Sequence, residues 1–306
     1  MKKTIIYTLL SLFTGIGFVA CGEDGLSSES VIVDKTTEQN ELDRWIEDNY
    51  TKSYNIDFIY RSDDREYNMS YNLVPPTYER SVAMAKLLLH VWLGTYDDVH
   101  GRLFTKTYIP KTIMLVGSGM YRSTSTVIGE AEGGQKITFA RINELNLTTP
   151  SLSELVGVPN FTGNGTDATG VLKTAFHEFS HILTQNKPLP EAFALISQND
   201  YVGDDWNASG TTPRAAWNKG FVTKYASHSP NEDFAEIVSI YIVRGESNWT
   251  QLLATAGTAG VTILNQKTEM INTYLKNFWG VTLDELRLGF EGRVANLDEI
   301  DLINLN

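Results

Sequence analysis

Two histidines and a glutamate have the clearest chemical potential in this chain: His177, Glu178 and His181 form the pattern H-E-x-x-H. Residues four apart lie on one face of a helix, so the two imidazoles would point the same way with Glu178 beside them. Imidazoles on adjacent turns can share one tetrahedral Zn²⁺, which leaves the glutamate free to take a proton from an attacking water. The pattern predicts a catalytic zinc site. The simpler alternative is a buried helix whose histidines only form hydrogen bonds.

The third zinc ligand must come from another segment of the chain. Thr184 and Lys187 stand where the longer pattern H-E-x-x-H-x-x-G-x-x-H requires Gly and His, which excludes the class of zinc sites that carries this pattern. Glu232 and Glu236 are four apart and share a helical face, so Glu232 could reach the zinc while Glu236 orients a ligating histidine from behind. An alternative for Glu232 remains, because residues 229–232 also read as a capping box that needs no metal.

Two residues just ahead of Glu232 are candidates for stabilising the oxyanion that forms when water attacks a carbonyl. They are Tyr225 and His228. A second donor beside the metal is expected because zinc alone stabilises this charge only in part. A phenol can donate without first being charged, and a histidine could do the same. Tyr225 could instead be an aromatic side chain packed at the rim of the site.

The elements that must position these residues follow from the spacing of apolar side chains. The apolar positions around H-E-x-x-H recur at three and four and predict a helix that ends before Pro188: Leu172, Phe176, Phe179 and Leu183. Residues 42–46 and 82–93 and the chain from 249 onward also read as helical, with a capping box at 282–285. Residues 56–60, 113–116 and 136–141 read as strands, and 131–134 as a turn. Residues 206–218 read as a polar loop or lid.

The N-terminal segment reads as a targeting signal rather than as part of the fold. Lys2 and Lys3 precede an apolar run over residues 5–20, and the run ends at Cys21, the only cysteine. This arrangement resembles a bacterial lipobox, in which the cysteine is lipidated. An ordinary secretory signal is the alternative. We therefore expect a lipoprotein signal peptide over 1–20, an acidic, Ser-rich tether over 21–40, and a catalytic domain over 41–306, anchored on the surface or the periplasmic face of the outer membrane.

Composition limits the partners. The formal net charge is −12, which argues against nucleic acid or an anionic lipid surface as a binding partner. A single cysteine allows no disulfide within the chain, so stability must come from a hydrophobic core.

The motif around Glu232 carries a resemblance to known metallopeptidases. The run N-E-D-F-A-E at residues 231–236 looks like the second motif of thermolysin-like gluzincins, and Tyr225 seven residues earlier makes it more similar to the catalytic domain of anthrax lethal factor. Residues 41–289 resemble the putative zinc-binding metallopeptidase lipoproteins of gut-type Gram-negative bacteria. The matching landmarks are W-I-x-x-N-Y at 45–50, Gly117-Ser118, A-E-G-G at 131–134, the H-E-F-S-H helix and the E-D-F-A-E helix.

The resemblance implies an α+β, zincin-like fold: a lobe of mixed sheet with the H-E-x-x-H helix, and a helical C-terminal lobe, with the metal between them. It implies Zn²⁺ bound by His177, His181 and Glu232, Glu178 as general base, and Tyr225 rather than His228 as oxyanion donor. A zincin would pair its substrate with an edge strand just ahead of the motif helix, for which 136–141 is the candidate, although a plain sheet strand is an equal alternative.

The predicted function is hydrolysis of a peptide or protein substrate. Genes of this family often lie beside outer-membrane import systems, which suggests such a system as a partner. The alternative is a catalytically idle lipoprotein that binds peptide or glycan for import. An intact Glu178 argues against it, because a structural zinc site needs no base.

Overall fold

The computed structural model describes residues 38–61, 73–122, 125–127, 129–132, 135–147, 150–157 and 170–305. The chain divides into Met1–Gln39 and a second compact unit, Asn40–Asn306, which contains the helices and strands given below. The predicted signal peptide, Cys21 and all but the last three residues of the predicted tether lie outside the described residues. No helix in the described part of the chain is both long and apolar enough to cross a membrane.

This unit contains a small mixed sheet of four strands. Its strand order is β1 (Asp57–Ile59), β2 (Thr112–Leu115), β6 (Lys136–Phe139) and β5 (Gly129–Glu132). β1, β2 and β6 are parallel, and β5 runs antiparallel to β6 at the edge. Ile113 lies opposite Phe58 on one side and Ile137 on the other, and all three side chains are buried, as expected of parallel strands. β3 (Met120–Arg122) and β4 (Ser125–Val127) form a separate antiparallel pair.

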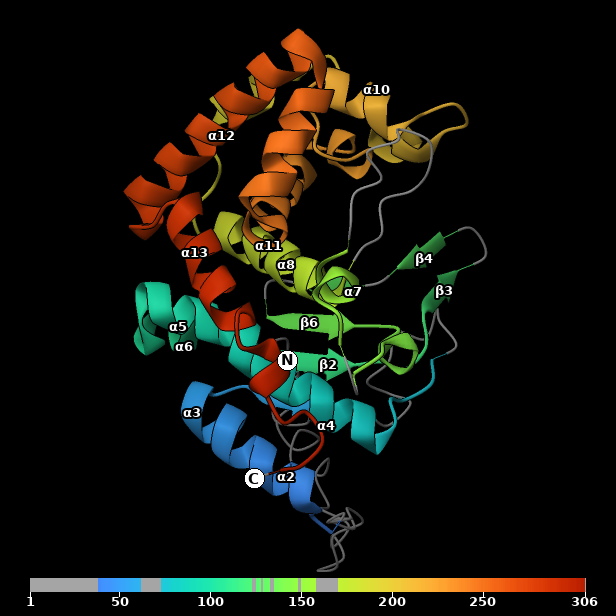
Figure 1. Cartoon of the computed structure of the whole chain (residues 1–306), viewed down its shortest axis with the longest axis vertical. Helices are drawn as coiled ribbons and strands as arrows, with labels where there is room; N and C mark the ends of the chain where they lie inside the picture. The colour runs from blue at the N-terminus through green and yellow to red at the C-terminus, as the bar shows by residue number, and fades with distance from the viewer. Residues whose placement is uncertain are drawn as a thin grey trace, which may run out of the picture. The chain divides into compact units, whose positions relative to one another are not determined.

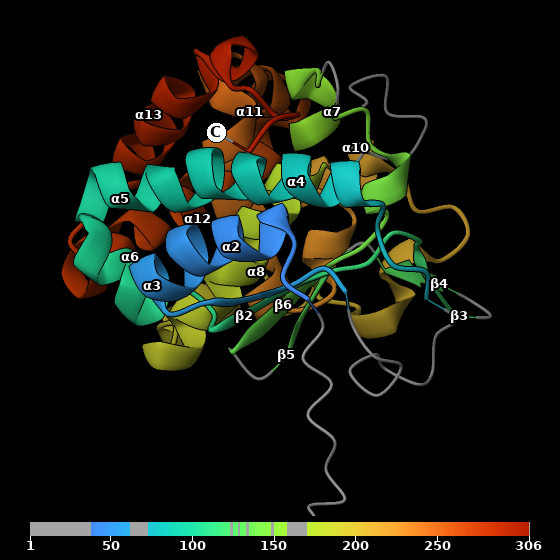
Figure 2. The same ribbon diagram turned by 90° about the horizontal axis from the view of Figure 1, so that it is seen from below.

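Two helical segments from the N-terminal half pack beside this sheet. The first runs through α2 (Glu41–Ile46), a π-helical turn η1 (Glu47–Thr51) and α3 (Lys52–Tyr54). The second runs through α4 (Tyr78–Leu87), the π-helical η2 (Leu88–Leu93) and α5 (Gly94–His100), followed by α6 (Arg102–Tyr108). Figure 2 shows α2 and α4 side by side, and the Tyr50 hydroxyl of η1 donates to the Ala85 carbonyl of α4 at 2.6 Å.

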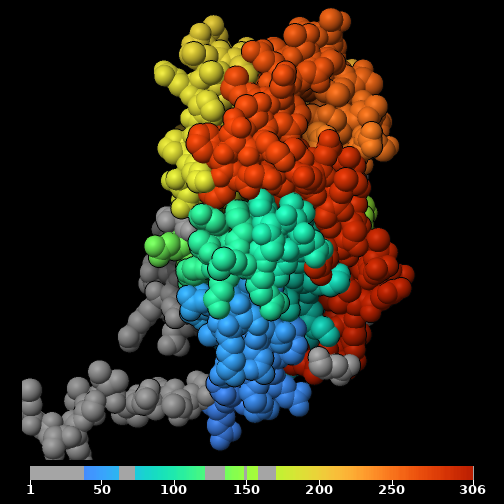
Figure 3. Space-filling view, turned by 90° about the vertical axis from the view of Figure 1, so that its left-hand side faces the viewer, coloured from blue at the N-terminus to red at the C-terminus, as the bar shows by residue number. Residues whose placement is uncertain are grey.

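The remaining elements are mainly helical. After η3 (Ile142–Glu144) they are α7 (Leu152–Val156), α8 (Val171–Asn186), α9 (Glu191–Ile196), η4 (Gly203–Asn207), α10 (Pro213–Asn218), η5 (Tyr225–Ser227), α11 (Pro230–Thr255), α12 (Gly257–Trp279), α13 (Leu283–Val294) and η6 (Leu297–Glu299). α11 is interrupted at Gly245, where φ is +74°. α8 and α11 form the most extensive contact between two elements (Figure 1). Figure 3 shows α12 and α13 stacked on α5 and α6, with α2 and α3 beyond them.

The two expected lobes share one hydrophobic core. Phe176 of α8 packs edge-to-face on Phe290 of α13, with ring centres 5.6 Å apart, and also contacts Tyr96 of α5. Trp92 of η2 packs edge-to-face on Phe139 of β6 and on Phe179 of α8. Buried side chains of the sheet, α8, α11 and α13 belong to the same cluster. The structure is therefore mostly helical around a small sheet, and the motif helix lies inside the common core.

Two expectations from the sequence concern the strands of this sheet. The strand predicted at 136–141 is confirmed as β6, but it lies between β2 and β5, so it is the plain sheet strand of the two alternatives, and the sheet edge nearest the motif helix is β5. Ala131 and Glu132, expected in a turn, belong to β5, while Gly133 and Gly134 lie outside the described residues.

The segment 206–218 is not simply a loop. Its second half is α10, which begins with Thr212 as N-cap and Pro213 in the first turn. Trp217 of α10 is fully buried and donates from its ring nitrogen to the Val222 carbonyl at 3.1 Å. This burial of a large aromatic side chain stabilises a helix that the polar composition concealed.

Candidate metal centre

The H-E-x-x-H helix is α8, and its predicted core face is confirmed. Leu172, Phe176, Phe179 and Leu183 are all buried. Gly170 is the N-cap of this helix, and a Cβ atom there would lie only 2.1 Å from the Leu155 carbonyl oxygen at the end of α7. Only glycine permits this close approach, which lets the start of α8 pack against the end of α7.

Glu232 lies in the first turn of α11, where the cap and the carboxylate have separate roles. The Ser229 hydroxyl accepts from the Glu232 backbone N–H at 3.3 Å, as predicted for an N-cap. No return bond from the Ser229 N–H to the Glu232 carboxylate occurs within the described residues. In α13, by contrast, the Glu285 carboxylate does accept from the Thr282 N–H, at 2.7 Å. The Glu232 side chain is therefore free to turn toward α8.

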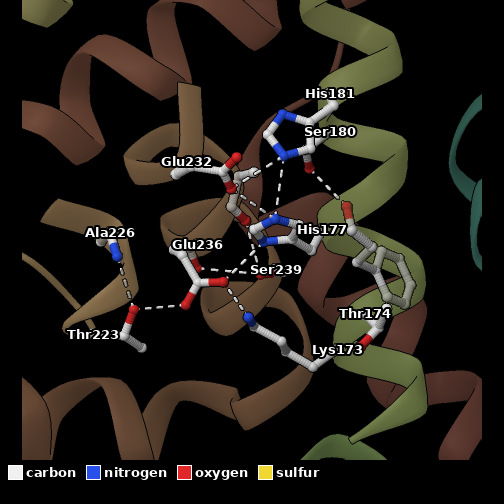
Figure 4. A network of polar contacts seen from close by, with 12 residues as sticks. Lys173, Thr174, His177, Ser180, His181, Thr223, Ala226, Glu232, Glu236 and Ser239 are labelled. Atoms are coloured by element: carbon white, nitrogen blue, oxygen red, sulfur yellow. Dashed lines mark hydrogen bonds and ion pairs between the residues drawn. The ribbon is translucent and has the colours of Figure 1, made fainter. Parts of the chain in front are cut away.

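The structure brings His177, His181 and Glu232 together (Figure 4). The two Nε2 atoms are 3.1 Å apart, and Glu232 Oε2 lies 3.1 Å from His177 Nε2 and 3.3 Å from His181 Nε2. A tetrahedral zinc with bonds of about 2.0–2.1 Å has ligand–ligand edges of about 3.3 Å, so the three donor atoms fit such an ion closely. The side chains of His181 and Glu232 are each 17% exposed, which leaves an open side where a fourth ligand could bind.

Glu236 lies behind His177, on the side away from Glu232 (Figure 4). Its Oε1 is 2.8 Å from His177 Nδ1, close enough for charge pairing although the angle is not that of a hydrogen bond. Oε1 also accepts from the ammonium of Lys173, and Oε2 accepts from the Thr223 hydroxyl at 2.7 Å. A carboxylate in this position fixes the ring orientation of a ligating histidine and makes it a better donor.

The charges of this cluster depend on one another. Burial and the Lys173 ammonium lower the pKa of His177, but Glu232 and Glu236 outweigh them and raise it to about 9. Burial would raise the pKa of Glu232, yet the two histidines hold it well below its usual range. Without metal, the His177 imidazolium thus bridges two carboxylates. A divalent cation would take the place of this proton, which is the exchange expected at a zinc site.

Tyr225 and Glu178 lie beside the three donor residues. Tyr225 belongs to η5, and its ring centre is 6.1 Å from that of His177. Burial raises the pKa of Tyr225, and the carboxylates of Glu232, Glu236 and Glu178 raise it further, so the phenol keeps its proton. Glu178 follows His177 directly on α8 and is 9% exposed, and its negative charge contributes to the raised pKa of Tyr225.

The other histidines lie elsewhere. His228 Nε2 is 3.3 Å from Oδ1 of the exposed Asp204, although the His228 ring is only 5.8 Å from that of Tyr225. His90 Nε2 is 3.2 Å from the Arg293 carbonyl oxygen, and His100 stacks on Phe104 at 3.9 Å. Among the described residues, His177, His181 and Glu232 are the group that could hold a metal ion, and none of these three other histidines belongs to it.

Two residues of the cluster were missed from the sequence, Lys173 and Thr223. Lys173 lies one helical turn before His177, on the same face of α8 as the ligands, and is only 6% exposed. A lysine four residues before His177 on an apolar helix could have been predicted to pair with a buried carboxylate, because lysine is almost never buried without a partner. Thr223 gave no comparable signal, since it contacts Glu236 from a loop.

Comparisons with known proteins agree with this geometry. Residues 35–284 match the model of a protein family described as "Putative zinc-binding metallo-peptidase". The chain is also similar to a "putative zinc-binding metallo-peptidase from Bacteroides caccae" whose crystal structure superposes with a TM-score of 0.72. The two are 35% identical, and the match covers 90% of this chain and 100% of that chain. A search of curated proteins finds no match.

Proposed function

The chain belongs to the "Putative zinc-binding metallo-peptidase" family, and from this premise we propose that it is a zinc-dependent peptidase of zincin-like fold. The observation that carries the proposal is the spacing of three donor atoms, 3.1, 3.1 and 3.3 Å apart, beside a glutamate that is not among them. That combination suits a catalytic zinc, since a structural site has no use for an open side and a base.

Each residue has a role in the proposed reaction. Zinc held by His177, His181 and Glu232 would supply a Lewis acid that makes a water molecule acidic and polarises the scissile carbonyl. Glu178 takes the proton of the attacking water and passes it to the leaving amine. Glu236 keeps the ring of His177 in its ligating orientation.

Tyr225 is the proposed oxyanion donor. Its phenol remains protonated among three carboxylates and can donate to the oxygen on which negative charge develops. His228 is less suited to this role because its Nε2 faces Asp204 on an exposed segment.

A peptide substrate could bind along β5. This strand contacts α8 and forms one of the two edges of the sheet, and its outer side has no strand partner among the described residues. An extended peptide can pair with such an edge through main-chain hydrogen bonds. Because these hydrogen bonds involve only the peptide backbone, peptides of many different sequences could bind along β5. Selectivity would then come from pockets that accept the side chains of the substrate.

We also propose a cellular location for the protein. Lipidation of Cys21 would anchor the chain to the outer membrane, on its surface or periplasmic face, with residues 21–40 as tether. This part of the proposal rests on the lipobox-like sequence alone. A peptidase placed there could supply peptides to an outer-membrane import system.

The test is metal content together with cleavage of a peptide library by the purified protein, with and without a chelator. We expect one zinc per chain and cleavage that the chelator abolishes and added zinc restores. Bound zinc without cleavage of any peptide would favour the idle binding protein instead.

A further inference from the structure

A second buried ion pair lies next to the metal centre and has no part in the proposed chemistry. Lys267 Nζ on α12 is 2.6 Å from Asp233 Oδ2 on α11, and both side chains have 0% exposure. Asp233 directly follows Glu232 in the first turn of α11. The pair thus links the middle of a C-terminal helix to the turn that carries the proposed third ligand.

The same two side chains hold two further segments. Asp233 Oδ2 also accepts from the Tyr201 hydroxyl at 2.9 Å. The Lys267 ammonium donates to the Gly220 carbonyl at 2.8 Å and lies 4.1 Å from the centre of the Phe221 ring. The other oxygen of Asp233 has no partner among the described residues. The carboxylate is therefore held at one oxygen, by Lys267 and Tyr201.

The surrounding backbone leaves Lys267 little freedom to shift. Gly260, two turns earlier on the same face of α12, would place a Cβ atom 2.1 Å from the Trp217 carbonyl oxygen. α12 therefore lies directly against the end of α10. On the other side, the Val202 N–H donates to the Ser227 carbonyl at 2.8 Å, which ties the Tyr201 segment to the turn ahead of α11.

Adjacent helical residues point about 100° apart, so clamping Asp233 toward α12 turns Glu232 toward α8. We propose that Lys267 is a positioning residue of the metal centre: by clamping Asp233 it fixes the rotation of the first turn of α11 at which Glu232 reaches both histidines. A buried ion pair is directional and contributes little net stability over an apolar pair of similar shape, which suits positioning better than stabilisation. The inference rests on the proposed role of Glu232 as a zinc ligand.

The test compares zinc affinity with the stability of the metal-free protein. The variants are Lys267→Met, the nearly isosteric uncharged pair Asp233→Asn/Lys267→Met, and the control Leu42→Ala. Leu42 is fully buried in α2, at the opposite end of the unit from α12 in Figure 1. Zinc affinity is measured by competition with a chromophoric chelator, and stability by the thermal unfolding midpoint without metal.

We expect Lys267→Met to lower both quantities, because it leaves Asp233 buried without its cation. In the uncharged pair, the unfolding midpoint should return most of the way to the wild-type value. Its zinc affinity should stay about tenfold or more below that of the wild type, which is the loss seen when groups that support a ligand are removed. Leu42→Ala should lower the midpoint by leaving a cavity and keep zinc affinity near that of the wild type.

Recovery of zinc affinity together with stability in the uncharged pair would overturn the positioning role, as would an equal loss of affinity in Leu42→Ala. If Lys267→Met does not fold, the uncharged pair alone decides. Failure of the wild type to bind zinc would contradict the ligand role of Glu232 itself, and this result is distinct because it does not involve Lys267.

Discussion

Replacing Lys173 by methionine would remove the buried cation behind the metal centre at almost constant volume. The side chains of Lys173 and Glu236 are 8% and 2% exposed, so the remaining carboxylate could not regain hydration. It would keep the Thr223 hydroxyl at 2.7 Å and His177 Nδ1 at 2.8 Å.

Removing one partner of a buried ion pair costs about 3–5 kcal/mol of unfolding free energy. We expect a value near the lower end, about 3 kcal/mol, because two groups continue to hold Glu236. For a domain of this size that corresponds to a fall of roughly 6–12 °C in the unfolding midpoint of the metal-free protein.

The loss of unfolding free energy in Lys173→Met should depend on pH in a defined direction. Despite its burial, the pKa of Glu236 is held well below its usual 4.5 by Lys173 and His177. Its ionisation therefore stabilises the folded state at pH above about 4.5, and this contribution is lost as the pH falls and Glu236 is protonated. The difference between wild type and Lys173→Met should thus be largest near neutral pH and shrink below pH 4.5.

Urea unfolding of the metal-free protein provides the assay. It compares wild type, Lys173→Met, Glu236→Gln and the double variant, so that the coupling between the two side chains is measured directly. The double variant should be more stable than the sum of the single losses predicts. A cost below about 1 kcal/mol for Lys173→Met, typical of an exposed pair, would refute the reasoning.

Three further substitutions test the remaining assignments. Glu232→Ala should abolish most zinc affinity while Glu236→Ala weakens it about 10–100-fold, and zinc titrations that gave the reverse order would make Glu236 the ligand. Tyr225→Phe should lower kcat about 10²–10³-fold in steady-state assays with zinc binding and KM near wild type, whereas that loss in His228→Ala instead would make His228 the oxyanion donor. Cys21→Ser should move the protein from the membrane fraction to the soluble fraction, and continued membrane retention would contradict a lipid anchor at that residue.

The parts of the site that could be predicted from sequence follow local periodicity. The spacing of His177 and His181 places them on one helical face, and the apolar residues around the motif place that helix in the core. Glu232 could be identified as a candidate because its carboxylate is four residues from a second one. Whether it capped its helix or turned to the histidines depended on the contact between α8 and α11, which a local pattern does not contain.

The parts that were missed depend on contacts between distant segments. Lys173 meets Glu236 across 63 positions of the chain, and nothing near either residue specifies the other. The edge strand β5 reads Gly-Glu-Ala-Glu, with no apolar alternation to indicate a strand. Its position follows from antiparallel pairing with β6 rather than from its own composition.

The central claim is that Glu178 is the base of a zinc peptidase, and Glu178→Gln tests it most directly. Glutamine preserves the volume of the side chain and leaves His177, His181 and Glu232 untouched, but it cannot accept the proton of the attacking water. Metal analysis and peptide-library cleavage are carried out on the same purified samples of wild type and variant. The account predicts an unchanged zinc content and no measurable cleavage by the variant; a zinc-loaded variant that cleaves as fast as the wild type would contradict it.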